Sequence, residues 1–227
     1  MIENLSWDST FFDFSVGKIF VENPSDFNKD EFFKAAKSYR LVYVFSRIPF
    51  VESTFMSLVD VKLTFQKSLF SSNTSTETLF FDEQIHEKNS LFQLAYESGK
   101  YSRFRTDPNF AINDFFSMYE IWVNKSIESK QSSVMIEVVN NDLLGFITVD
   151  FDNSDTATIG LIAVSQKCRG QGVGGKLLIQ AENLALKHDR KLVKVATQKE
   201  NVQASAFYQK NGFVLADQLY IYHFWNL

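Results

Sequence analysis

The chain has 227 residues, of which 45% are hydrophobic and 22% are charged. This length allows one large domain or two small ones, and the composition excludes a disordered or fibrous chain. The formal net charge of −4 argues against general binding of nucleic acid. The longest apolar stretch, residues 41–51, contains Arg47 and Pro49 and is shorter than the roughly 20 residues of a membrane-spanning helix, so no membrane segment is expected.

The N-terminus and the cysteine content indicate the compartment. Glu3 and Asp8 lie in the first residues, where a secretory signal would carry basic side chains. Cys168 is the one cysteine, so an intrachain disulfide is excluded and too few soft ligands remain for a zinc site. We therefore expect a cytoplasmic protein without a metal.

The first hundred residues read as a small α/β domain. Their apolar patterns predict strands at 10–22, 39–48 and 51–69, and a helix at 26–38 that begins after Ser25 or Asp26. The polar stretch 71–78 predicts a break, and a helix from residue 84 is expected to end at Gly99. We place the domain boundary there, with an N-terminal domain over 1–98 on the acceptor side and a second domain over 99–227.

The second part alternates helices and strands. A helix is predicted at 112–129, followed by strands at 133–140 and 143–151 joined by a hairpin turn at Asn140, Asn141 and Asp142. Further on, the pattern predicts a strand at 157–164, a glycine-rich loop, a helix to about 187, a strand at 191–198, a short helix ending at Gly212 and terminal strands at 213–216 and 219–226. The fold class is therefore mixed α/β or α+β.

The glycine-rich loop is the most informative feature of the sequence. Four of the nine glycines lie within 170–175, between a strand that reads as buried and an amphipathic helix. Such a loop lets backbone N–H groups point inward, and the following helix adds its unpaired N–H groups and the positive end of its dipole. Between 167 and 210 nine basic residues stand against three acidic ones. The loop thus predicts a cradle for a small anion such as pyrophosphate.

Two common phosphate-binding motifs fit this loop poorly. A P-loop needs a hydroxyl residue after its lysine, whereas Lys176 is followed by Leu177. The dinucleotide fingerprint Gly-x-Gly-x-x-Gly matches the spacing, but its acidic partner should follow a second strand, and Asp189 lies at a charged helix end.

A third motif fits better. The segment Ile162-Ala163-Val164, followed by Arg169-Gly170-x-Gly172-Val173-Gly174, resembles motif A of the GNAT acetyltransferases, although Ser165-Gln166 departs from the family's usual loop entry. Farther along, Asn201, Ala204, Ala206-Phe207-Tyr208 and Asn211-Gly212-Phe213 look like motif B. The resemblance implies a GNAT fold, which is a mixed, mostly antiparallel sheet flanked by helices, here with a smaller N-terminal α/β domain.

The resemblance also assigns roles in acetyl transfer from acetyl-CoA to an amine. A backbone N–H near Ile162 would polarise the thioester carbonyl, and Tyr208 would be the acid for the departing thiolate, with a buried packing role as the alternative. Asn201 is also expected to cap the next helix. The residues expected to bind the cosubstrate are Ile162, Ala163, Val164, Arg169, Gly170, Gln171, Gly172, Val173, Gly174, Gly175, Asn201 and Ala204.

No general base is evident from the sequence. Asp150, Asp152 and Asp155 precede the strand at 157–164 and are best interpreted as residues of a solvated turn. His223 lies in an alternating terminal strand, where packing is the alternative to contact with the substrate. Cys168 has no neighbouring histidine base and is expected to be a loop residue.

For the acceptor, residues 5–12, 101–110 and 119–126 resemble the TDP-fucosamine acetyltransferase group. That resemblance implies an amino sugar carried on dTDP and makes a homodimer reasonable. Arg103 and Arg105 would meet a diphosphate, and Tyr101, Phe104 or Phe110 would stack on a base or sugar face. A surface loop anchored by Phe104 is the alternative. Two other functions stay open, namely a GNAT enzyme acting on a peptide N-terminus or a polyamine, and a non-catalytic acyl-CoA-binding module.

Overall fold

The computed structural model of the protein describes residues 1–51, 54–70, 77–152 and 154–227. The chain divides by internal contacts into two compact units. The first unit comprises residues 1–63, 198–200 and 217–227, and the second comprises 64–197 and 201–216. This division assigns residues 64–98 to the second unit, so the boundary at residue 99 that separates an acceptor domain from a transferase domain stays a prediction.

The first unit combines a small sheet with two helices. Its elements are β1 (Glu3–Asn4), α1 (Ser6–Phe12), β2 (Val16–Phe20), a 3-10 turn (Pro24–Asp26), α2 (Lys29–Ala36), β3 (Leu41–Ser46) and parts of β4 (Ser57–Ser68) and β10 (Val214–Trp225). Strand β2 pairs antiparallel with β1 and parallel with β3, which pairs antiparallel with β10. Phe32 and Ala36 of α2 join Val42, Val44 and Tyr222 in one core.

Two predictions for this unit are corrected by the structure. The strand expected at 10–22 begins at Val16, because residues 6–12 form α1 and Asp13 follows in a left-handed conformation with φ of 57°. Helix α2 begins after Asn28, whose side chain accepts hydrogen bonds from the N–H groups of Asp30 and Glu31. The expected caps Ser25 and Asp26 lie in the preceding 3-10 turn.

The second unit is built on a mostly antiparallel sheet flanked by helices. Strands β9, β8, β7, β6 and β5 lie in this order, and only the β8–β9 pair among them is parallel. The strands are β5 (Leu79–Phe80), β6 (Ser132–Val139), β7 (Asp142–Phe151), β8 (Thr156–Val164) and β9 (Leu192–Gln198). The helices are α3 (Lys88–Ser98), α4 (Arg103–Thr106), α5 (Ile112–Glu128), a 3-10 turn (Gln166–Cys168), α6 (Val173–Lys187) and α7 (Val202–Lys210).

Most of the elements predicted here are confirmed. Asn140 and Asn141 form the hairpin turn, with φ of 52° and 67°. The helix expected from residue 84 begins at Lys88, and the two expected terminal strands form the single strand β10. Residues 71–76 of the break predicted at 71–78 lie outside the described residues, as do residues 52 and 53 of the strand expected at 51–69. Asn153, in the turn expected before the strand at 157–164, also lies outside them.

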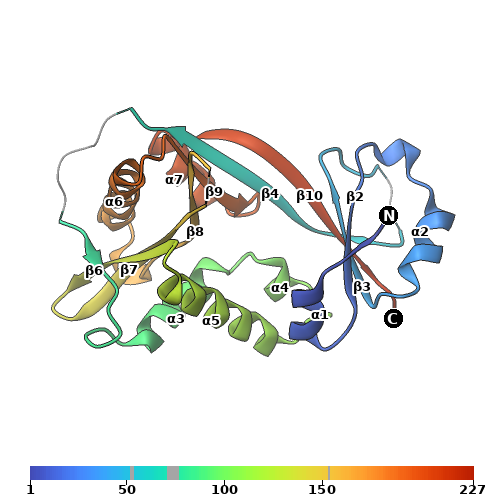
Figure 1. The fold of residues 1–227 in the computed structure, drawn as a ribbon, viewed down its shortest axis with the longest axis horizontal. Coiled ribbons are helices and arrows are strands. Elements are labelled where there is room, and N and C mark those ends of the chain that lie inside the picture. The colour runs from blue at the N-terminus through green and yellow to red at the C-terminus, as the bar shows by residue number, and fades with distance from the viewer. Residues whose placement is uncertain (52–53, 71–76, 153) are drawn as a thin grey trace. The chain divides into compact units, whose positions relative to one another are not determined.

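The two faces of this sheet carry different helices. Helix α6 covers one side of β6–β8, and α3 and α5 lie on the other (Figure 1). A Cβ added to Gly145 of β7 would lie 3.2 Å from Leu177 of α6, and Phe151 stacks on His188 at the C-terminal end of that helix with 4.2 Å between centroids. Since successive strand residues point to opposite faces, the odd-numbered residues from Gly145 to Phe151 face α6, and Thr148 and Asp150 face the side of α3 and α5.

Within the ranges that the structure describes, no helix combines the length and apolar character needed to cross a membrane.

Candidate functional site

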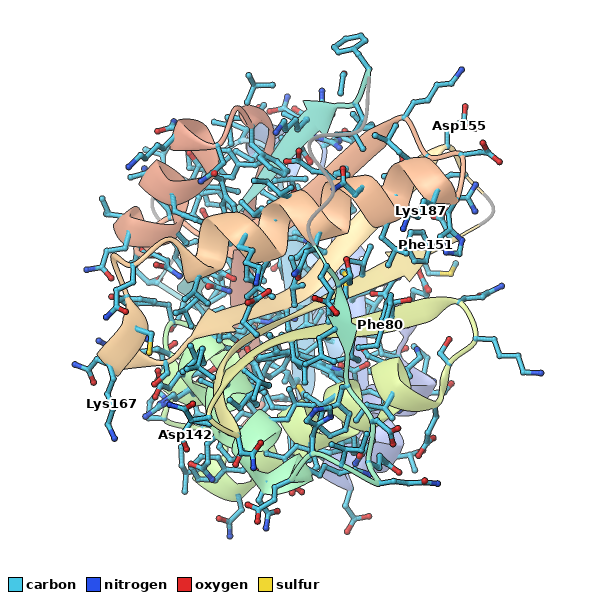
Figure 2. The ribbon with its side chains drawn as sticks, turned by 90° about the vertical axis from the view of Figure 1, so that its left-hand side faces the viewer. Phe80, Asp142, Phe151, Asp155, Lys167 and Lys187 are labelled. Atoms are coloured by element: carbon cyan, nitrogen blue, oxygen red, sulfur yellow. The ribbon has the colours of Figure 1, made fainter. Side chains whose placement is uncertain are left out.

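The glycine-rich loop joins the end of β8 to the start of α6. Gly170 and Gly172 have φ of 79° and 86°, a left-handed conformation that side-chain-bearing residues rarely adopt. A Cβ added to either residue would meet no atom within 4 Å. The backbone conformation, and not crowding, therefore requires glycine, and the space beside both residues is open. Figure 2 shows Lys167 at this loop, away from Lys187 at the far end of α6.

The first turn of α6 leaves its N–H groups available to a ligand. Gly172 is the N-cap and offers no side chain, and its carbonyl accepts the first intrahelical bond, from the N–H of Lys176. The amides of Val173, Gly174 and Gly175 precede that bond and lie at the positive end of the helix dipole. The exposed Gln171 side chain donates to the carbonyl of Lys167. The loop and the helix start therefore have the donors that a pyrophosphate group requires.

Gly174 has a different reason to be glycine. A Cβ at this position would lie 3.1 Å from Cζ of Phe207 on α7 and 3.5 Å from Cγ2 of Val164 on β8. The missing side chain lets the first turn of α6 pack closely against both elements. This contact fixes the loop relative to the end of β8.

Arg169 connects the loop to β8 and to α3. Its Nε donates to the carbonyl of Val164 at 3.1 Å, and its Nη2 pairs with Glu97 of α3 at 2.8 Å. Both side chains are about half exposed, so the ion pair itself adds little stability. The guanidinium is thus held beside the end of β8 with half of the side chain exposed.

Strand β8 leaves β9 next to the loop. The parallel pairing runs from Thr156 opposite Leu192 to Ile159 opposite Val195 and ends there. Strand β8 continues to Val164, so the predicted residues Ile162, Ala163 and Val164 lie on the part that has diverged from β9.

A β-bulge accompanies the divergence. The register between β7 and β8 shifts between the pairs Ile147–Ile162 and Val149–Ile159, which places one extra residue in β8. The hydroxyl of Thr148, which is 1% exposed, accepts a hydrogen bond from the N–H of Leu161 at 2.8 Å. A side-chain hydroxyl thus satisfies a backbone donor that the bulge would otherwise leave unpaired.

Tyr208 lies on α7 and is 3% exposed. Its ring packs against Phe65 and Phe213, with centroid distances of 5.7 and 5.9 Å. Burial raises the pKa of the Tyr208 phenol above its ordinary value, so the phenol keeps its proton at neutral pH. Asn201 caps α7 by accepting from the N–H of Ala204 at 3.2 Å, as the sequence predicts.

Several ion pairs at this site join residues far apart in sequence and were not predicted. Lys67 of β4 donates to Glu182 of α6 at 2.6 Å, and the Glu182 side chain is only 2% exposed. Glu137 of β6 accepts from Lys176 and from Gln180 of α6, both at 2.6 Å. These contacts hold α6 on the sheet at two places.

The residues predicted to bind the acceptor lie in different environments. Phe104 is 5% exposed and packs against Phe110 and Trp122, so its ring belongs to the core of the second unit. The guanidinium of Arg103 lies over the Phe104 ring at 4.3 Å, while Arg105 is exposed. A contact between these residues and a substrate stays a prediction.

His223 belongs to the first unit. It lies opposite Tyr43 in the pairing of β10 with β3, and the two rings are 5.0 Å apart. It is 1% exposed, and the Tyr43 hydroxyl donates to Asp8 at 3.3 Å. The structure therefore places this histidine in the interior of a polar and aromatic cluster. Its role in substrate binding stays a prediction.

The described parts of the chain contain no group of three or more His, Cys, Asp or Glu side chains that could hold a metal ion.

Comparisons with known proteins agree with the loop geometry. Residues 96–213 match the family model described as "Acetyltransferase (GNAT) family". The chain is 22% identical over 139 residues to the spore coat polysaccharide biosynthesis protein SpsD of Bacillus subtilis, which covers 61% of this chain and 48% of that protein. It is 28% identical over 125 residues to a dTDP-fucosamine acetyltransferase of Escherichia coli, covering 54% and 53%. The chain thus spans about half the length of these curated relatives.

A solved structure supports the fold. An acetyltransferase of the GNAT family from Colwellia psychrerythraea superposes with a TM-score of 0.55 at 15% identity, over 82% of this chain and 66% of that one. The mixed, mostly antiparallel sheet flanked by helices and the GNAT fold expected from the sequence are confirmed.

Proposed function

Because the chain belongs to the GNAT acetyltransferase family, we propose that it is an acetyl-CoA-dependent N-acetyltransferase acting on the amine of a nucleotide-linked amino sugar of the dTDP-4-amino-4,6-dideoxyhexose type. The observation that carries this proposal is the open loop of Gly170 and Gly172 at the uncapped start of α6, directly beside the part of β8 that has diverged from β9.

The fit of acetyl-CoA to this loop follows from its donors. The amides of residues 170–175 can bind the pyrophosphate, because the two left-handed glycines leave the approach open and no side chain caps the helix. Arg169 adds a positive charge at the same place. Bound there, the cosubstrate supplies an acetyl thioester as the activated group.

The diverged part of β8 and helix α7 support the chemistry of transfer. The N–H of Ile162, in the diverged part of β8, polarises the thioester carbonyl and stabilises the negative charge that forms on its oxygen. Tyr208 protonates the departing thiolate. Burial raises the pKa of this phenol, so the phenol is protonated when the thiolate forms. The amine is acetylated directly, without an acyl-enzyme.

The acceptor assignment depends on two relatives and one exposed side chain. One relative is named a dTDP-fucosamine acetyltransferase and the other a spore coat polysaccharide biosynthesis protein, so both names concern sugars. Exposed Arg105 in the segment 101–110 suits a diphosphate by its planar donor geometry.

A thermal-shift titration followed by a transfer assay tests the proposal. A ligand that binds only the folded state at 100 times its Kd adds about 2.7 kcal/mol of stability. We expect a shift with acetyl-CoA, a further shift with CoA plus a dTDP-4-amino sugar, and release of free CoA thiol when acetyl-CoA and that sugar are combined. Stabilisation by acetyl-CoA with turnover only on polyamines or peptides would contradict the acceptor assignment. Absence of any shift with saturating acetyl-CoA would contradict the cradle itself.

A further inference from the structure

Asp150 differs from the other acidic residues near it. The sequence suggests that Asp150, Asp152 and Asp155 share a solvated turn, and for Asp150 this interpretation is wrong. Asp150 lies inside β7, opposite Ser132 of β6 and Thr158 of β8. It is half-buried, while Asp152 and Asp155 are exposed. A carboxylate held within a sheet, at a fixed position relative to β8, needs its own explanation.

The carboxylate of Asp150 lies on the sheet face opposite α6. Gly145 and Phe151 contact α6, so the alternation along β7 directs Asp150 to the other face. Thr158, its partner on β8, lies on that same face and is exposed. Helices α3 and α5 lie on this face of the sheet (Figure 1), but Thr158 and Gly160 beside Asp150 are exposed. With the donor bound at the glycine loop and the start of α6, an acceptor can therefore approach the diverged strand at this exposed part.

Hydrogen bonding orients the carboxylate toward the bulge of β8. The hydroxyl of Ser132 donates to Oδ1 of Asp150 at 2.6 Å. The second oxygen, Oδ2, lies 3.2 Å from the position that a Cβ on Gly160 would occupy. Gly160 is exposed and is the first residue of β8 after its pairing with β9 ends at Ile159. The same Cβ would lie 2.8 Å from Oγ1 of Thr148, so glycine at this position keeps a side chain from covering Oδ2 where the pairing with β9 ends.

The charge of Asp150 is not neutralised by an ion pair within the described part of the chain. Among the described residues the ion pairs involve other carboxylates, and Asp150 forms none. Lys194 of β9 pairs with Thr158, so one strand separates this basic residue from Asp150. A half-buried carboxylate that is ordered by one neutral hydroxyl and open on its other oxygen is complementary to an ammonium group.

We propose that Asp150 is a catalytic residue that binds the ammonium group of the acceptor and removes its proton. This inference rests on the proposed acetyltransferase function. The ammonium passes one proton to Oδ2, and the neutral amine nitrogen forms a bond to the thioester carbonyl carbon. As the C–S bond breaks, the sulfur takes a proton from Tyr208. The amide nitrogen loses its second proton to water, which also reprotonates Tyr208 and removes the proton from Asp150.

The test compares Asp150→Asn with Asp155→Asn. Asparagine keeps an acceptor for the Ser132 hydroxyl and removes only the charge. Asp155 is an exposed carboxylate at the start of β8 whose backbone carbonyl accepts from Lys191, a bond that Asn also keeps. For Asp150→Asn we expect kcat/KM for the amine to fall by about 100-fold or more, with unchanged binding of acetyl-CoA and partial recovery at alkaline pH, where the amine is already neutral. Asp155→Asn should match the wild-type protein.

A third variant tests the orientation. Ser132→Ala leaves the charge but removes the hydrogen bond that aims it, so we expect a smaller loss, about tenfold at most. The outcomes separate the two proposals. A wild-type protein that acetylates no amine contradicts the proposed function. An active wild-type protein with an Asp150→Asn variant of equal kcat/KM over the pH range overturns the role of Asp150 and leaves the acetyltransferase function standing.

Discussion

Glycine at position 172 allows a left-handed backbone, and it also leaves room for a ligand. Replacing Gly172 by alanine tests both effects, the first by stability and the second by binding of acetyl-CoA. The residue has φ of 86°, so a Cβ introduces strain of about 1–2 kcal/mol whatever the space around it. No atom lies within 4 Å of that Cβ, so no steric clash adds to the strain. For a chain of 227 residues, 1 kcal/mol corresponds to about 2–4 °C in Tm. We therefore expect Gly172→Ala to lower Tm by roughly 2–8 °C.

The same methyl group occupies the open side of the loop, where we place the pyrophosphate. Calorimetric titration with acetyl-CoA should therefore show Kd raised by at least about tenfold, which is 1.4 kcal/mol. Gly175→Ala is the matched control. Its Cβ would lie 3.8 Å from Asn211 Oδ1, which is an ordinary contact, and its φ is not positive. Alanine in a helix is favoured over glycine, so this variant should be as stable as the wild type or more so. A Gly172→Ala variant that loses stability but binds acetyl-CoA normally would refute the binding of the pyrophosphate by this loop.

Three further variants test separate contacts. Tyr208→Phe should reduce kcat by about 100-fold or more with little change in KM for acetyl-CoA, and unchanged turnover in a steady-state assay would remove its role as the acid. Lys67→Met should destabilise the fold by about 2 kcal/mol in urea unfolding, because it leaves the buried Glu182 carboxylate without this cation. Lys67 is a quarter exposed, so we expect a smaller loss than the roughly 3–5 kcal/mol of fully buried pairs. Arg169→Ala should cost no more than about 1 kcal/mol of stability, because its pair with Glu97 is half exposed, yet should weaken acetyl-CoA binding in calorimetry; equal affinity would contradict its place in the cradle.

The glycine loop could be predicted because its signal is local. The left-handed glycines, the helix start and the preceding strand lie within about twenty residues, and the residue types there indicate the backbone conformation of each. The hairpin at Asn140 and Asn141 is predicted for the same reason, since asparagine tolerates a positive φ.

Helix α1 shows where local patterns fail. Its seven residues are rich in aromatic side chains, which favour strands, and its N-cap Leu5 provides no side-chain hydrogen bond. Stacking of Trp7 on Phe11, with centroids 5.2 Å apart, and burial of Phe12 accompany the helical conformation. Tertiary packing of this kind overrides propensity.

The missed parts of the site depend on distant residues. Lys67 and Glu182 are 115 positions apart, and Arg169 and Glu97 are 72 positions apart, so the spacing in the sequence predicts neither pair. The polar residues that follow Asp150 suggest a turn, although the strand predicted at 143–151 already includes Asp150. Its pairing with Ser132 and Thr158 decides between these two interpretations in favour of the strand.

Mass spectrometry of the reaction products tests the central claim most directly. The wild-type protein is incubated with acetyl-CoA and a dTDP-4-amino-4,6-dideoxy sugar. The mass of the sugar nucleotide and the amount of released CoA are then measured. Our account predicts one acetyl group gained by the sugar amine for each CoA released. Intact sugar nucleotide alongside unreacted acetyl-CoA, from a protein that acetyl-CoA stabilises, would contradict the transfer that we assign to this site.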